Sequence, residues 1–284
     1  MSEAAATIEP PLPVLILIHG ATLNGHMWDP VRRHLDPRFA KVLAPDLPGH
    51  GSRRGERFTM EAAVATIADL TRSLDGAPVI LAGDSLGGFT ALASAAAVPQ
   101  AQLRGLVLSG CTANVKGLKI LLHFIPKATL IKALLAVFGE HRLLGQVQNK
   151  TRDMLKGAQV ADEDIDALLA SGLSMRAFPE AVSALTGVDY RAKLAAVSQP
   201  VVLVNGDKDH VMLQQEADFI ATARRGQHRR FDCEHGVSLL RSAQFAGLIN
   251  EFALGTALSL APNAAVMRAR PGKGLSTKLD EQGR

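Results

Sequence analysis

The chain has 284 residues, of which 47% are hydrophobic and only 4% aromatic, so it can bury one sizeable core lined mainly by aliphatic side chains. The formal net charge is +4, and five basic against two acidic residues from Ala257 onward account for most of it. A nearly neutral body without a basic patch interleaved with aromatic residues argues against nucleic-acid binding. We expect residues 257–284 to form a disordered, basic tail.

The first apolar run, residues 14–18, is too short for a signal sequence or a membrane span. Two cysteines, Cys111 and Cys233, are too few for a disulfide framework, and both follow strand-like runs where a small buried thiol fits. We therefore expect a cytoplasmic protein.

Short apolar runs alternate with helix-length segments along most of the chain. The runs are apolar at consecutive positions, as strands buried on both faces must be. Helical segments such as 59–74, 86–97 and 236–252 lie between or after them. The pattern predicts an α/β fold with a mostly parallel, doubly wound sheet of about six strands. The expected strands are 14–20, 41–47, 78–85, 103–110, 200–206 and 228–233.

The alternation is interrupted once, between the fourth and fifth expected strands. The interval 111–187 holds apolar helical stretches such as 118–138, and another helix that begins at the acidic run 162–166. It is far longer than one crossover helix requires, so we interpret it as an inserted helical cap. Lysines at 119, 127 and 132 interrupt its apolar run, which argues against stable membrane insertion. The core would comprise residues 1–110 and 188–256.

Ser85 lies at the centre of the only Gly-x-Ser-x-Gly pattern, Gly83-Asp84-Ser85-Leu86-Gly87. An expected strand precedes it and an Ala-rich helix follows it. A serine at such a turn sits in strained backbone, and the flanking glycines remove side chains that would clash. The helix N-terminus is directed at any negative charge that develops nearby. The setting therefore indicates a nucleophile.

Together with this motif, the chain resembles the α/β-hydrolase fold superfamily over about 14–252. His19-Gly20 resembles the oxyanion loop, with Trp28 at the position of a common aromatic residue. The run Asp46-Leu-Pro-Gly-His-Gly-Ser52 resembles a second family loop, and His235-Gly236 resembles the catalytic His-Gly. Too few residues precede the first strand for the hairpin that opens the full family sheet, so we expect that hairpin to be missing.

The resemblance assigns the remaining roles. His235, beyond the last expected strand, would be the base that activates Ser85. The acid should follow the strand 200–206, where the family's Gly-x-x-Asp spacing selects Asp209 and leaves Asp207 in reserve. The acid would hold the imidazole in the correct tautomer. Backbone amides of Ala21 and Leu86 would form the oxyanion hole. His19 and His50 would make structural hydrogen bonds.

These residues predict a serine hydrolase that cleaves a carboxylic ester or related acyl bond through an acyl-enzyme. The same triad would serve a lactonase, thioesterase, acyltransferase, carbon–carbon hydrolase or perhydrolase. A receptor-like homologue that binds a small ligand with little turnover is the alternative class. We expect a small, apolar acyl substrate, and neither a cofactor nor a metal.

Apolar residues of the expected cap allow two interpretations. They could roof the pocket, which would favour medium or longer acyl chains, or they could only form the core of the cap itself. The residues concerned are Leu118, Ile120, Leu121, Leu122, Phe124, Ile125, Leu134, Leu135 and Phe138.

Overall fold

A computed structural model describes residues 12–113 and 118–258 and contains one six-stranded sheet. All strand pairs are parallel, and the strand order is β2-β1-β3-β4-β5-β6. An isolated parallel bridge between Leu12 and Phe39 extends the β1–β2 edge. The strands are β1 (Val14–Ile18), β2 (Val42–Leu43), β3 (Val79–Asp84), β4 (Leu103–Ser109), β5 (Val201–Gly206) and β6 (Gly226–Phe231).

Helices cover both faces of the sheet, which explains the consecutive apolar residues in its central strands. All five residues of β1 are buried. Val14, Ile16 and Ile18 belong to the core cluster on one face, whereas Leu15 and Leu17 belong to the cluster on the other. Because successive side chains of a strand point to opposite faces, a strand covered on both sides must be apolar throughout. The edge strand β6, by contrast, is mostly exposed.

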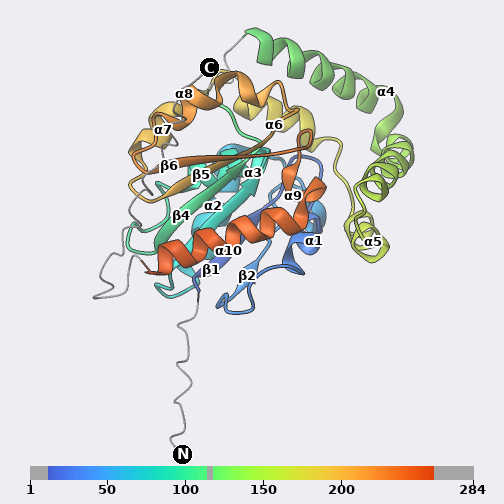
Figure 1. Cartoon of the computed structure of the whole chain (residues 1–284). Helices are drawn as coiled ribbons and strands as arrows, with labels where there is room; N and C mark the ends of the chain where they lie inside the picture. The colour runs from blue at the N-terminus through green and yellow to red at the C-terminus, as the bar shows by residue number, and fades with distance from the viewer. Residues whose placement is uncertain (1–11, 114–117, 259–284) are drawn as a thin grey trace, which may run out of the picture.

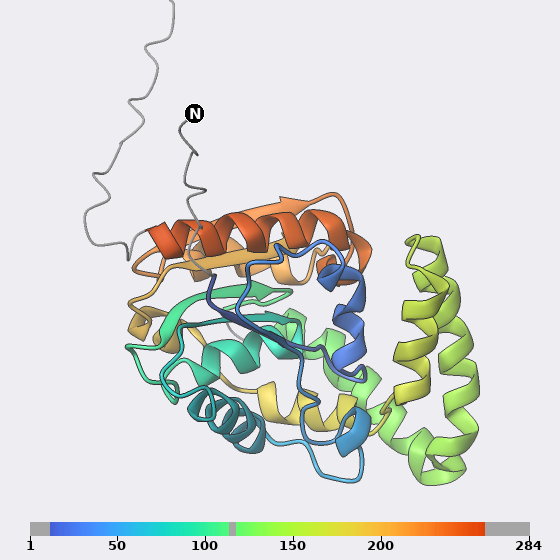
Figure 2. The ribbon, with the colours of Figure 1, turned by 90° about the horizontal axis from the view of Figure 1, so that it is seen from below.

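Three layers are visible when the molecule is viewed from below (Figure 2). Helices α2, α3 and α7 contribute to the core on one face of the sheet, and α1 and α10 to the core on the other. A further short helix, α9, adjoins α10 (Figure 1). The bounds of these helices and of α8 are α1 (Asp29–Arg32), α2 (Met60–Arg72), α3 (Leu86–Ser94), α7 (Arg191–Ala196), α8 (Glu216–Ile220), α9 (Val237–Leu240) and α10 (Ser242–Leu258).

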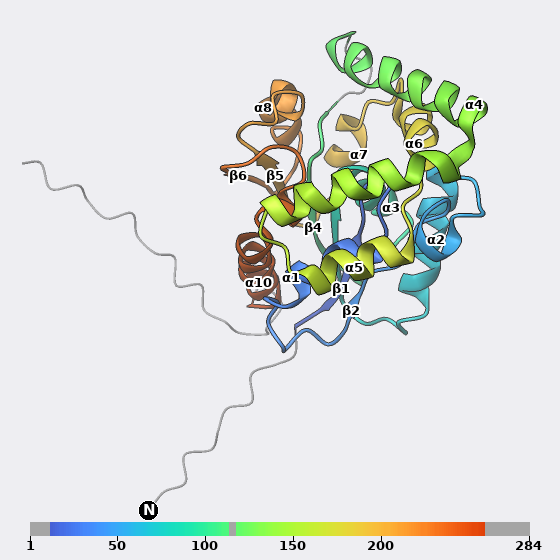
Figure 3. The ribbon, with the colours of Figure 1, turned by 90° about the vertical axis from the view of Figure 1, so that its right-hand side faces the viewer.

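The helical insertion lies between β4 and β5 and consists of α4 (Leu118–Gly157), α5 (Asp162–Ser171) and α6 (Ala177–Leu185). Non-helical backbone at Gly139 divides α4 into two helical halves. Figure 3 shows the second half of α4 and α5 crossing one side of the molecule together. We refer to α4, α5 and α6 as the cap.

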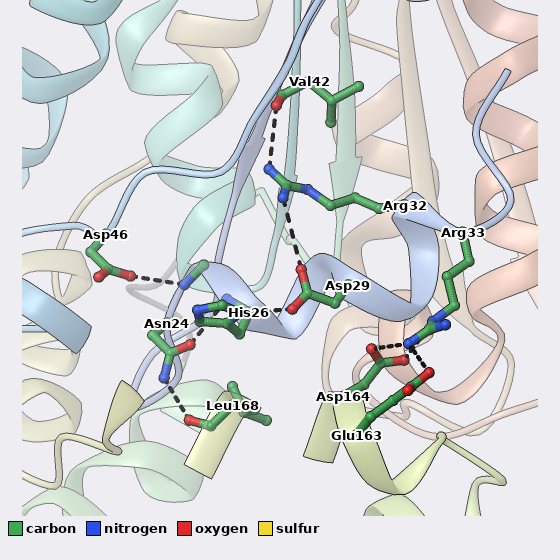
Figure 4. Close-up of polar contacts among 11 residues, drawn as sticks. Asn24, His26, Asp29, Arg32, Arg33, Val42, Asp46, Glu163, Asp164 and Leu168 are labelled. Carbon is green, nitrogen blue, oxygen red and sulfur yellow. Dashed lines mark hydrogen bonds and ion pairs between the residues drawn. The ribbon is translucent and has the colours of Figure 1, made fainter. Parts of the chain in front are cut away.

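Polar contacts attach α5 to the short helical segment η1 (Gly25–Trp28) and to α1 (Figure 4). The guanidinium of Arg33 donates to both carboxylate oxygens of Asp164, at 3.0 and 2.7 Å, and forms an ion pair with Glu163. The Asn24 amide donates to the Leu168 carbonyl oxygen at 2.9 Å. These bonds fix the position of the cap beside the loop that follows β1.

The fold class expected from the sequence is confirmed: a parallel six-stranded sheet with flanking helices and a helical insertion. Differences occur at element ends. The helix expected over 118–138 is the first half of α4, which is followed beyond Gly139 by a second half that reaches Gly157. The helix expected over 236–252 is split into α9 and α10. Most of the predicted tail, residues 259–284, lies outside the described residues.

Candidate active site

Ser85 occupies the sharp turn between β3 and α3. Its backbone has φ 54° and ψ −117°, a left-handed φ that is uncommon for a residue with a side chain. A Cβ atom on Gly83 would lie 2.1 Å from the Gly87 carbonyl oxygen, and one on Gly87 would lie 1.9 Å from the Ile18 carbonyl oxygen. Both positions therefore require glycine, because the turn is packed tightly against its own helix and against β1.

Three side chains from distant parts of the sequence meet at this turn. The Nε2 atom of His235 lies 2.9 Å from the Oγ atom of Ser85. On the other side of the imidazole, Nδ1 lies 2.5 Å from Oδ2 of Asp209. Asp209 is buried, and its Oδ1 atom accepts a hydrogen bond of 3.2 Å from the Met212 amide. The structure thus brings Ser85, His235 and Asp209 together in the order that the sequence predicts.

The surroundings favour a charged Asp209 and a more basic His235. Burial by itself would raise the pKa of Asp209, but the hydrogen bond and charge of His235 and the amides of Met212 and Val211 outweigh it and lower that pKa. Burial by itself would lower the pKa of His235, yet the bond to Asp209 and the charges of Asp84 and Asp209 raise it above 6.5.

The loop after β1 lies beside Ser85 and is held by buried polar contacts. His19 Nε2 accepts from the Leu47 amide at 3.0 Å, and its Nδ1 donates to the Gly20 carbonyl oxygen at 2.8 Å. Burial lowers the pKa of His19, in keeping with this neutral tautomer. The His19 and His50 rings pack against each other at a tilt of 59° with centroids 4.8 Å apart, and Nδ1 of His50 lies 2.9 Å from the Pro48 carbonyl oxygen. These histidines are structural.

The second family loop supports the same region through one carboxylate. Asp46 accepts hydrogen bonds from the amides of Gly25 and Ser52, each of 2.8 Å, and another from the Ser52 hydroxyl. Ala21 and Leu86 both line the cavity next to Ser85. Within the described part of the chain, neither amide has a hydrogen-bond acceptor, so both are available to a ligand.

A cavity of about 50 Å³ adjoins Ser85. Apart from the Ser85 and Thr112 hydroxyls its lining is apolar, and the cap supplies about half of it. The hydroxyl of Thr112 is buried and has no hydrogen-bond partner among the described residues. The lining residues are Ala21, Ser85, Leu86, Phe89, Thr112, Phe124, Phe178, Ala181, Val182, Leu185 and Met212.

The structure decides between the two candidate acids and adds site residues that the sequence did not indicate. Asp207, the reserve acid, is exposed, and the carboxylate that contacts His235 is that of Asp209. Thr112 was missed, although its position three residues after β4, at the carboxyl edge of the sheet, is a signal for a binding residue. The cap residues of α6 were also missed, because their role depends on how that helix docks.

Neither earlier interpretation covers all apolar residues of the cap. Phe124 lines the cavity, and Leu134 and Leu135 are partly buried. The side chains of Leu118, Ile120 and Leu121 lie outside the described ones. Leu122, Ile125 and Phe138 instead face solvent, with exposed fractions of 64%, 41% and 48%.

In the residues that the structure describes, no group of three or more His, Cys, Asp or Glu side chains is placed to hold a metal ion. A strained serine, an imidazole and a buried carboxylate in hydrogen-bonding contact define the class of serine hydrolases.

Comparison with known proteins agrees with this class. The model of the alpha/beta hydrolase family matches residues 15–248. A pimeloyl-(acyl-carrier protein) methyl ester esterase of Aromatoleum aromaticum is 30% identical over 268 residues, which cover 86% of this chain and 99% of the relative. The magnesium-chelatase 30 kDa subunit of Rhodobacter capsulatus is 26% identical, and the match covers 86% of this chain and 87% of that subunit.

Solved structures agree on the fold. The enol-lactonase of Burkholderia xenovorans LB400 superposes with a TM-score of 0.68 at 20% identity, covering 86% of this chain and 92% of that one. The chain belongs to the alpha/beta hydrolase family. The family, the site and the similarity to the esterase of Aromatoleum aromaticum together support serine hydrolase activity with a reaction of the esterase type.

Proposed function

We propose that the protein hydrolyses a carboxylic ester through an acyl-enzyme on Ser85. His235 Nε2 removes the proton from Ser85 Oγ as this oxygen bonds to the carbonyl carbon of the ester. Collapse of the tetrahedral intermediate breaks the bond to the alcohol oxygen, which takes the proton from His235. A water molecule then attacks the acyl-enzyme by the same route, which releases the acid and restores Ser85. The observation that carries the proposal is the Ser85–His235–Asp209 contact chain.

The amides of Ala21 and Leu86 are proposed to bind the oxyanion of both tetrahedral intermediates. Support comes from the position of both residues in the cavity wall with Ser85 and from the absence of a competing acceptor within the described residues. The Leu86 amide is also the first of α3, so the positive end of that helix adds to the effect. The loss of one such donor costs about 3 kcal/mol of transition-state stabilisation.

The cavity suggests which acyl groups fit. An engineered apolar cavity of about 150 Å³ accepts a benzene molecule. A cavity of about 50 Å³ therefore favours an apolar acyl group of a few carbons. Medium or longer chains were expected if the apolar cap residues roofed the pocket, but only some of those residues face this cavity. The Thr112 hydroxyl, which lacks a partner, supports recognition of one polar atom on the substrate.

Turnover, rather than binding alone, is favoured by the intact contact chain and by the position of Ala21 and Leu86 in the cavity wall beside Ser85. A receptor-like homologue would need neither. Lactones and thioesters present the same carbonyl chemistry, and the relatives named above include an esterase and an enol-lactonase. We propose that the protein acts in the cytoplasm, where thiols such as Cys111 and Cys233 stay reduced.

Two measurements test this proposal. A fluorophosphonate probe should label the protein, and Ser85→Ala should abolish the labelling while Ser73→Ala, at the exposed end of α2, leaves it unchanged. In a panel of p-nitrophenyl esters, thioesters and lactones, acetate to butyrate esters should be the best substrates, and Ser85→Ala should lower kcat by about 10⁴-fold or more. Folded protein that neither labels nor turns over any member of the panel would support the binding alternative.

A further inference from the structure

The first half of α4 presents an apolar face to solvent. Large side chains along it are strongly exposed: Leu122 by 64%, Leu130 by 60% and Val137 by 73%. Residues 122, 126, 130, 133 and 137 follow the three- and four-residue spacing of one helix face, so the exposed side chains form a continuous stripe. We call it the outer face of α4. Monomeric proteins rarely leave such a stripe uncovered without a partner for it.

The charged residues on this half of α4 itself are all lysines. The sequence has no Asp or Glu between Ser85 and Gly139, whereas Lys127 and Lys132 lie on this half of the helix and are exposed. The next acid, Glu140, is turned inward and accepts a hydrogen bond of 2.7 Å from the Met175 amide. Lysines beside an apolar stripe can extend their ammonium groups to anionic headgroups while the stripe enters the apolar layer.

From this combination we infer that the outer face of α4 docks on the surface of an anionic lipid bilayer. The residues 122–138 would lie in the interface with the helix axis along the membrane plane. The apolar stripe supplies buried area, and each lysine adds electrostatic attraction that raises the affinity about fivefold. The inference rests on this surface alone and does not require the proposed reaction.

A second copy of the chain fits this face less well. A symmetric contact between two copies would bring two sets of lysines together with no acidic residue of this helix half to pair with them. A transmembrane arrangement also fits poorly. The segment Leu122–Gly157 is long and apolar enough to cross a membrane by length and composition. Gly139 interrupts it, however, and the half after Gly139 carries charges of both signs.

The docked face would lie close to the catalytic cavity. A groove of about 310 Å³ runs between α4 and α6 and is bordered by Ile125, Lys132 and Pro179. Val182 lines both this groove and the cavity beside Ser85, so one side chain forms part of the wall between them. The same half of α4 directs Phe124 into the cavity. A molecule dissolved in the membrane would therefore reach the protein next to its site.

Vesicle flotation of the purified full-length protein tests the inference. At about 0.1 M salt the protein should bind vesicles of phosphatidylcholine and phosphatidylglycerol more than tenfold better than phosphatidylcholine alone. The double variant Lys127→Gln and Lys132→Gln should weaken binding to the anionic vesicles about thirtyfold. Leu130→Asp with Val137→Asp should weaken binding to both kinds of vesicle to below detection. Met154→Asp, at a 51% exposed apolar position beyond Gly139, is the matched control and should bind as the parent does.

Sedimentation measurements on the same proteins distinguish membrane docking from contact between two copies of the chain. All variants should stay folded by circular dichroism, since the substituted side chains are exposed. If the parent protein ignores both vesicles, the inference is wrong. It is also wrong if the parent is a dimer that ignores vesicles and becomes a monomer when Leu130 and Val137 are replaced. The Ser85→Ala variant should bind vesicles normally, which separates this result from that of the proposed reaction.

Discussion

Replacement of Asp209 by Asn tests the role of the buried carboxylate most directly. In the structure Oδ1 of Asp209 accepts from the Met212 amide, and Oδ2 lies against Nδ1 of His235. An asparagine has only one acceptor oxygen, and the Met212 amide requires it. Its NH₂ group would then face Nδ1 and force the imidazole proton onto Nε2. With that proton in place, Nε2 can no longer accept the proton of Ser85.

The expected loss follows from this change of tautomer. A correctly shaped triad with the wrong histidine tautomer loses about 10⁴-fold in kcat, or about 5.5 kcal/mol of transition-state stabilisation. KM should change little, because Asp209 does not line the cavity. The assay is kcat and KM on p-nitrophenyl butyrate, together with the melting temperature to establish folding.

Asp207→Asn is the matched control. This carboxylate lies two residues earlier in the same turn but is exposed, so its replacement should leave kcat within about twofold of the parent value. If Asp209→Asn retained activity within tenfold of the parent, Asp209 would not be the residue that orients His235.

Three further outcomes are expected. Because the pKa of His235 is raised and only the neutral imidazole is a base, kcat/KM should rise with pH through a midpoint above 6.5. Asp84→Asn removes a negative charge that raises this pKa, so it should move the midpoint down. An unmoved midpoint would show that the Asp84 charge does not raise the pKa of His235. Gly87→Ala would place a Cβ against the main chain of β1 and should lower Tm by about 10 °C or more. Gly247→Ala is the control, because this position in α10 has open space around it and its Tm should not fall. Equal Tm values for the two variants would refute the close contact between Gly87 and β1. Ala181→Val narrows the cavity and should reduce the rate on butyrate esters more than on acetate esters, and uniform loss across chain lengths would place the acyl group elsewhere.

The sheet could be predicted from the sequence because burial on both faces leaves a plain signature. The runs 14–18 and 79–84 are buried throughout and are apolar at nearly every position. Helix ends were harder to predict. The helix expected to reach residue 97 ends at Ser94. The alanines at 95–97 favour a helix by composition, but the amides of Ala95 and Ala97 bond to carbonyl oxygens only three residues earlier, which is tighter than α-helical spacing. Helix propensity alone does not resolve such an end.

Within the site, predictability depended on whether a residue's role is local. Ser85 was predictable because the strained turn imposes glycines two residues away on either side. The choice between Asp207 and Asp209 depends on the path of the chain after β5. There the Asp207 amide still bonds to the Phe231 carbonyl oxygen beside the sheet, and the turn that follows buries Asp209 against His235. Only a family spacing, and no local pattern, indicated that path.

The outer face of α4 shows why composition could not settle the role of the cap. The first half of this helix is apolar on nearly every side, so periodicity cannot say which side packs inward. The docking of α6 decides it: Ala128 is buried and Phe124 reaches the cavity, which turns Leu130 and Val137 outward. A helix that served only as the core of its cap would carry polar residues on that side. Apolar residues there are costly in water, and this half of the helix carries lysines but no acidic residue. The membrane docking that we infer would cover the apolar side chains with a low-dielectric layer and place the lysines beside negative charge.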